Sequence, residues 1–200
     1  MKFLKNIFSP KGKPTPTNLP KETDNSECEK EDITLDERFV KKFIDAGGKF
    51  LYSESPQETL ENFNQILNEN DWFGTKVCCY EEELKVSLSN IDLEFTNDTD
   101  AMFYLATCEF LISDIGGILL TNTQLKDTKT SELPNNIIIF AKTSQIIENI
   151  DVGLQHFKKT REKIPTNIST VRQFGTENKD DFLSYGSMRK NLYLLLLENL

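Results

Sequence analysis

Two carboxylates stand beside a glycine pair in the segment "ATCEFLISDIGGILLTN", residues 106–122. The acids are Glu109 and Asp114, and the glycines are Gly116 and Gly117. Carboxylates at a site can act as a general base or accept hydrogen bonds from substrate hydroxyls. They can equally cap local turns through backbone N–H groups. The glycines fit either a tight turn with positive φ or the close approach of a ligand. The segment is therefore a candidate catalytic site, with a structural bend as the alternative.

Polar side chains also follow two apolar runs that are predicted strands. Thr121 and Asn122 come after "GILL", and Lys142, Thr143 and Ser144 come after "IIIFA". Ligands of open parallel α/β sheets bind beyond the carboxyl ends of the strands. The second group would also begin a helix, whose unpaired N–H groups favour an anion. These residues predict a binding site for a small carboxylate or phosphate, and ordinary helix capping by Ser144 is the alternative.

Three other kinds of side chain could contribute chemistry. Arg189 follows a glycine turn, where it faces either the anionic ligand or solvent in a charged loop. Cys108 lies in an apolar run without a neighbouring cation to lower its pKa, so it is interpreted as a small buried residue. His156 is interpreted as a surface or edge residue of a helix. With one histidine and four cysteines without ligand spacing, no metal site is predicted.

Alternating strands and helices predict an α/β domain with a largely parallel central sheet. Residues 1–34 are predicted to be an N-terminal arm and a disordered linker, the linker covering 9–33, and residues 35–200 the folded domain. Within the domain we expect a short helix or irregular turn over 101–113 and a strand over 117–121. We expect that strand, with its preceding bend, at the mouth of the central sheet. The remaining expected helices are "LDERFVKKFIDAGG", "SPQETLENFNQILNEN", "EEELKVSL" and "SQIIENIDVGLQHFKK", and the remaining strands are "KFLY", "KVCCY", "NNIIIFA", "NISTV" and the apolar "NLYLLLLE", for which a buried helix is the alternative.

The charge balance limits the classes of partner. The 200 residues carry 23 basic and 32 acidic side chains, a net charge of −9, which argues against general nucleic-acid binding. No segment has the ~18 apolar residues that span a bilayer, and the opening "MKFLKNIF" is too short for a signal peptide, so a cytoplasmic protein is expected. Residues 1–13 hold four lysines and no acid, which fits either a short helix that lies on a membrane surface or docks on a partner, or a frayed terminus.

Three segments in order resemble the LUD (lactate utilisation) domain family, especially its C-type member. That family has a small residue and Asp, an Ala-rich turn, Ile-Ala-Glu-Thr-Gly-Thr/Ser and an apolar strand; this chain has "CEFLISDIGGILL" at the same spacing. Glu109 stands at the family's Asp, Asp114 at its Glu, and Gly116 at its Gly. The runs "ELPNNIIIFAKTSQIIENI" and "YGSMRKNLYLLLLENL" are similar to the later family segments.

The resemblance implies a three-layer α/β/α fold similar to the sugar-phosphate isomerase and CoA-transferase superfold. It also implies a role in bacterial lactate oxidation beside partner subunits that carry iron–sulfur clusters. This chain lacks cluster-type cysteine spacing, so no cofactor is expected in it. Two family runs are absent: "STVRQFGTENKDDF" replaces Gly-Pro-Ser-Arg-Thr-Ala-Asp, and "SMRK" replaces His-Gly-Pro. The chain is therefore identified as a divergent member.

Two hypotheses of function follow. The first is an accessory subunit in lactate or organic-acid utilisation that binds a small anionic metabolite and an iron–sulfur partner. The second is a non-catalytic ligand-binding or interaction module that has kept the fold and lost the site. A third option is a sugar-phosphate isomerase. Its only support is the analogy of the superfold, and a shared fold does not establish function.

Overall fold

The computed structural model describes residues 33–161, 165, 167–172 and 190–199. The predicted arm before Ile33, the basic segment 1–13 and Arg189 lie outside the described residues. The helices of the described part are α2 (Leu35–Asp45), α3 (Pro56–Glu69), α4 (Glu82–Ser87), α5 (Asn122–Leu125), α6 (Ile150–Thr160) and the 3₁₀ helix η1 (Thr143–Gln145). Its strands are β1 (Lys49–Ser53), β2 (Lys76–Cys78), β3 (Glu94–Thr96), β4 (Phe103–Thr107), β5 (Phe110–Ile112), β6 (Gly117–Thr121), β7 (Asn136–Lys142), β8 (Ile146–Ile147), β9 (Ile168–Val171) and β10 (Asn191–Leu197).

The strands form two sheets. The central sheet has six strands in the order β1-β10-β7-β4-β2-β3, and all of its pairs are parallel. The second sheet has four strands in the order β8-β5-β6-β9, with β6 antiparallel to both neighbours. The predicted α/β class with a largely parallel central sheet is confirmed. The second sheet is an additional feature that the sequence did not predict.

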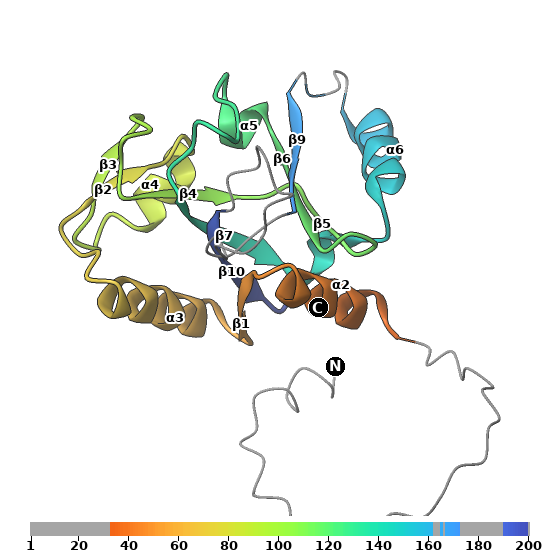
Figure 1. Cartoon of the computed structure of the whole chain (residues 1–200), viewed down its shortest axis with the longest axis horizontal. Coiled ribbons are helices and arrows are strands. Elements are labelled where there is room, and N and C mark those ends of the chain that lie inside the picture. Colours follow the sequence, from red (N-terminus) through yellow and green to blue (C-terminus); the bar gives the residue numbers. More distant parts are fainter. Residues whose placement is uncertain (1–32, 162–164, 166, 173–189, 200) are drawn as a thin grey trace, which may run out of the picture.

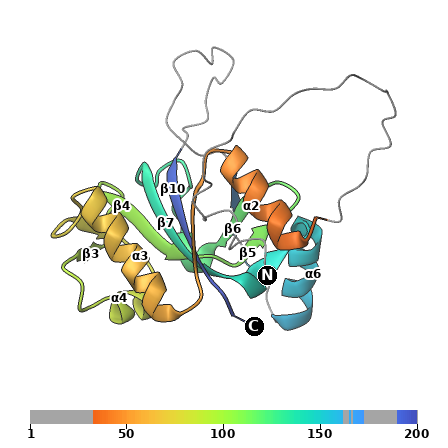
Figure 2. The same cartoon turned by 90° about the horizontal axis from the view of Figure 1, so that it is seen from below.

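The apolar run at the C-terminus is the strand β10, which lies between β1 and β7 in the six-stranded sheet and is buried on both faces. Leu192, Leu194 and Leu196 face a core shared with α2 and the second sheet. Tyr193 and Leu195 face a core built on α3. Burial on both faces explains why the run is apolar throughout rather than alternating with polar residues. Figure 1 shows α6 on the outer side of the second sheet, and Figure 2 shows α3 and α2 on either side of β1 and β10, in agreement with the two cores.

Capping residues fix the two helices nearest the central sheet. Thr34 accepts a hydrogen bond from the Glu37 amide at the start of α2, and Gly47, with φ of 90°, follows its end. Ser55 caps α3 by accepting a hydrogen bond from the Glu58 amide, with Pro56 in the first turn. The Glu58 side chain reaches back to the amide of residue 54 rather than to the cap itself.

Two local predictions are wrong. The segment 101–113 forms the strands β4 and β5 instead of a helix or turn. The bend at 113–116 joins β5 to β6 as a hairpin, so Ile118–Leu120 lies in the second sheet and not in the central one. The physical reason is the pairing of Phe110 with Leu119, which turns β6 back along β5 before it can reach the central sheet.

Candidate functional site

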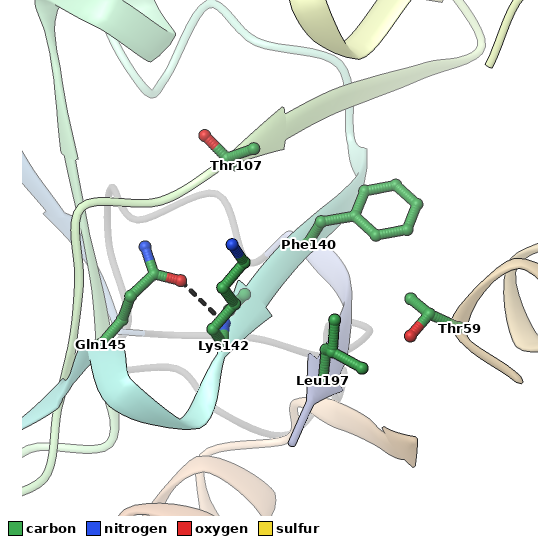
Figure 3. A pocket seen from close by; sticks show the side chains of 7 residues that line it. Thr59, Thr107, Phe140, Lys142, Gln145 and Leu197 are labelled. Atoms are coloured by element: carbon green, nitrogen blue, oxygen red, sulfur yellow. Dashed lines mark hydrogen bonds between the residues drawn. The ribbon is translucent and has the colours of Figure 1, made fainter. Parts of the chain in front are cut away.

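A cavity of about 440 Å³ lies at the carboxyl ends of three central strands. Its lining residues come from β4, β7, β10, α3 and η1 and are Thr59, Thr107, Phe140, Ala141, Lys142, Gln145 and Leu197 (Figure 3). This edge is the general place for ligands in open parallel α/β sheets. The cavity therefore lies at the edge of the sheet where the sequence predicted a site. Of its lining residues, Lys142 was predicted and the others were not.

Lys142 is the charged residue among the described lining residues. It ends β7, in register with Leu197 at the end of β10. Its backbone N–H donates to the Gln145 Oε1 at 2.7 Å. Figure 3 shows its side chain rising from the strand end beside Gln145, on the side of Thr107. Within the described part of the chain its ammonium group makes no salt bridge, so the charge is available to an anion.

Gln145 connects the cavity floor to the link between β4 and β5. Its Nε2 donates to the carbonyl oxygens of Cys108 at 2.5 Å and Glu109 at 3.3 Å. Because its Oε1 accepts from the Lys142 amide, both ends of the side chain are occupied. Gln145 therefore positions the strand ends that carry Lys142 and Thr107.

Thr107 joins the cavity to a half-buried carboxylate, Glu81, which follows β2. The backbone N–H and Oγ1 of Thr107 donate to the two Glu81 carboxylate oxygens at 2.7 and 2.5 Å. Gln124 Nε2 contacts the same Oγ1 at 3.4 Å. Burial raises the pKa of Glu81 and the nearby Glu109 charge adds to this, while the bonds from Thr107 act in the opposite direction. Glu81 is the residue before α4, and unlike it the first two residues of that helix, Glu82 and Glu83, are exposed.

Glu109, the first predicted catalytic acid, is held in the same polar network. Its Oε1 accepts from Thr121 Oγ1 at 3.0 Å, and its Oε2 accepts from Arg161 Nη2 at 2.8 Å. Its side chain is 13% exposed. Thr121 in turn caps the short helix α5, whose first residue, Asn122, is exposed. Both carboxylate oxygens of Glu109 thus bind protein groups, and neither it nor Thr121 nor Asn122 lines the cavity.

Asp114 and the glycines form the hairpin turn between β5 and β6. Asp114 is exposed, its amide donates to Glu148 O, and its carbonyl accepts from Lys42 Nζ of α2. Gly116 has φ of +61°, and a Cβ there would lie 2.6 Å from the α2 backbone. Gly117 begins β6 without positive φ. The close approach that Gly116 permits is thus to a helix, and these residues do not line the cavity.

Thr143 and Ser144 contact the end of the described chain instead of opening a long helix. They lie in η1, and α6 begins later with Asn149 as its cap, so the prediction of a helix start at Ser144 is wrong. The Ser144 amide donates to Asn199 Oδ1 at 3.0 Å, and Thr143 Oγ1 contacts the same atom at 3.1 Å. The prediction that unpaired N–H groups at a helix start would bind an anion here is therefore not supported, because the Ser144 N–H already donates to Asn199.

The cysteine and histidine interpretations agree with the structure. Cys108 is 4% exposed, and burial raises the pKa of its thiol. His156 is exposed on α6, with its ring edge-on to Phe110 at 5.4 Å between centroids. Across the described residues, no group of three or more His, Cys, Asp or Glu side chains could hold a metal ion. In the same ranges, no helix combines the length and apolarity needed to cross a membrane.

Sequence reasoning missed six lining residues and Glu81. The missed lining residues are Thr59, Thr107, Phe140, Ala141, Gln145 and Leu197. A usable signal existed for Thr107, since it is the polar residue ending the apolar run "FYLA". The expectation of a helix or turn over 101–113 hides this signal, because a polar residue marks a strand end only where a strand is expected.

A crystal structure of a DUF162 family protein from Deinococcus radiodurans is similar to this chain, with a TM-score of 0.57. The similarity covers 82% of this chain and 96% of that one, at 15% sequence identity. The two chains share a fold. DUF162 is the LUD domain family, so the fold that the sequence resemblance implied is the one observed. No protein-family model matches the sequence, and neither does any curated protein.

Proposed function

We propose that this chain is a LUD-domain protein that binds a small organic-acid anion at the carboxyl edge of its central sheet. The observation that supports this most is the placement of Lys142 in the cavity, without a salt bridge among the described residues. A carboxylate there would gain a charge-assisted hydrogen bond, the stronger kind in proteins. The DUF162 fold supports the family part of the proposal.

Within that family, the proposed cellular role is an accessory subunit of lactate or related organic-acid utilisation in the cytoplasm. The three described cysteines are buried, and their spacing does not suit an iron–sulfur cluster. Any cluster of the proposed complex would therefore be held by a partner protein. We expect the chain to co-purify with an iron–sulfur subunit, and a deletion strain to grow poorly on lactate. Normal growth together with no association would contradict this role.

Ligand binding is tested by calorimetry with L-lactate, pyruvate and glycolate on the full chain. Lys142→Ala should reduce the affinity by about tenfold or more, as expected for a lost charged hydrogen bond. Lys41→Ala is the matched control, because Lys41 is an exposed lysine on α2 and is absent from the cavity. Equal affinities for the two variants would contradict a role for Lys142.

A second candidate function is a ligand-binding or interaction module without catalysis. It is favoured by the absence of an acid among the described cavity-lining residues and by the pairing of both Glu109 oxygens. A general base must reach the proton that it removes, and neither predicted acid lines the cavity. Turnover of a bound acid that is lost in Glu109→Gln with binding retained would exclude this alternative.

A further inference from the structure

The walls of the cavity are more apolar than a small hydroxy acid requires. Phe140 contributes its ring, which packs on Phe63 of α3 with centroids 5.3 Å apart. Leu197 and Ala141 add aliphatic surface from β10 and β7. Figure 3 shows the Phe140 ring and the Leu197 side chain on the same side of Lys142, facing Thr59.

The hydrogen-bond donors of the described lining side chains, apart from the Lys142 ammonium, already bond to the protein. Thr59 Oγ1 donates to Ser55 O at 3.1 Å, and Thr107 Oγ1 donates to Glu81 at 2.5 Å. Gln145 uses its Nε2 and Oε1 on backbone groups. A ligand with several hydroxyls would therefore find few free side-chain donors, because a hydroxyl that already donates its proton can only accept from it.

We infer that the cavity binds a monocarboxylate with an apolar tail, with the carboxylate on Lys142 and the tail between Phe140 and Leu197. This inference rests on the proposed function, since it specifies the class of organic acid bound at that site. A volume of about 440 Å³ is typical of sites for drug-sized ligands, and a three-carbon acid would leave the apolar walls uncovered. Sugar phosphates fit poorly because the described lining side chains offer one cation and no further free hydrogen-bond donor for the phosphate oxygens.

The test is calorimetry of the full chain with acetate, butanoate and hexanoate at constant ionic strength, beside L-lactate, ribose 5-phosphate and the neutral hexan-1-ol. Affinity should rise about fourfold for each added methylene, the factor for burying one such group. Hexan-1-ol should bind at least about tenfold more weakly than hexanoate, because it lacks the charge that Lys142 recognises.

Two variants test the carboxylate and the apolar tail of the ligand separately. Lys142→Met keeps the aliphatic stem and should weaken hexanoate by about tenfold or more while leaving hexan-1-ol unchanged. Leu197→Trp fills the tail region and should remove the chain-length dependence with acetate binding retained. Far-UV circular dichroism of both variants establishes that they fold.

The outcomes distinguish this inference from the proposed function. Failure of every acid to bind overturns the proposed anion site itself. L-lactate binding as tightly as hexanoate overturns the apolar tail and leaves the proposed function standing. Ribose 5-phosphate binding more tightly than hexanoate, or equal binding of hexan-1-ol, likewise overturns the inference.

Discussion

Glu81, Glu83 and Glu109 have different surroundings, and these surroundings determine how easily each carboxylate carries its negative charge. Glu81 is turned inward onto Thr107, whereas Glu83 of the same acidic run is exposed on α4. Glu109 is paired with Arg161. A negative charge costs more where water is excluded, so the ionised form of Glu81 is disfavoured relative to the unfolded chain.

The raised pKa of Glu81 predicts a pH-dependent contribution to stability. Below the unfolded pKa the group is protonated in both states and contributes nothing. As the pH rises towards the higher folded pKa, the unfolded chain loses its proton first, so the free energy of unfolding falls. Glu81→Gln removes this titration, and its stability relative to the native chain should therefore increase with pH.

Urea unfolding of both proteins between about pH 4 and about pH 8 measures this difference. Glu83→Gln is the matched control, since its side chain is exposed on the adjacent helix. A stability difference between Glu81→Gln and the native chain that stays constant across this range would contradict the burial argument.

The residue scale also shows how far the site could be predicted. Lys142 was identified because the carboxyl ends of parallel strands are a general location for ligands. Glu109 and Asp114 have the residue types of a site, yet their partners are Arg161 and the groups of α2. Those partners lie far away in the sequence, so residue type alone could not separate a buried network from a catalytic acid.

At the scale of elements, the β5–β6 hairpin docks against α2 through its turn. Ser113 Oγ donates to Leu35 O at 2.7 Å and accepts from Arg38 Nε at 2.9 Å. The Gly116 position approaches the α2 backbone so closely that a Cβ would lie 2.6 Å from Lys42 C and Phe43 N. The hairpin turn is therefore a packing contact between the second sheet and α2.

This contact predicts that Gly116→Ala is strongly destabilising. Its φ of +61° costs a residue with a Cβ about 1–2 kcal/mol, and the backbone contact adds to that. We expect a loss of at least about 2 kcal/mol in the free energy of unfolding. Gly117→Ala is the control, because its Cβ would meet the flexible side-chain ends of Ile115 and Thr170 at 3.0 Å, and it should cost about 1 kcal/mol or less. Equal losses in urea unfolding would contradict the docking argument.

The elements that the sequence predicted correctly are those with local signals. Ser55 and Pro56 mark the start of α3, and the β-branched run of β7 marks a buried strand. The start of α6 was misplaced because Ser144 and Asn149 are both acceptable caps. The choice depends on Asn199, which pairs with Ser144, and on Ile146, which pairs with Leu111 of β5. Both contacts join parts of the chain that are distant in sequence, and so does the pairing of β6 with β9 in the second sheet. Local sequence signals do not reveal such contacts.

At the scale of the whole molecule, the two sheets share one core. Leu120 of β6, Phe43 of α2 and Leu194 of β10 belong to the same buried cluster. A separate cluster on the opposite face of the central sheet contains Trp72, the one tryptophan of the chain. Because β10 contributes to both clusters, loss of packing at the second sheet should reach the far face of the central one.

Leu120→Ala tests this coupling. Leu120 is 1% exposed, and truncating a buried leucine costs about 2–5 kcal/mol. If the described domain unfolds as one cooperative unit, the urea midpoints measured by Trp72 fluorescence and by far-UV circular dichroism should coincide and shift together. Val152→Ala, at a position 40% exposed on α6, should shift neither by much. If the fluorescence midpoint stays at the native value while the dichroism signal falls earlier, the second sheet unfolds separately, and the shared core does not couple the two halves.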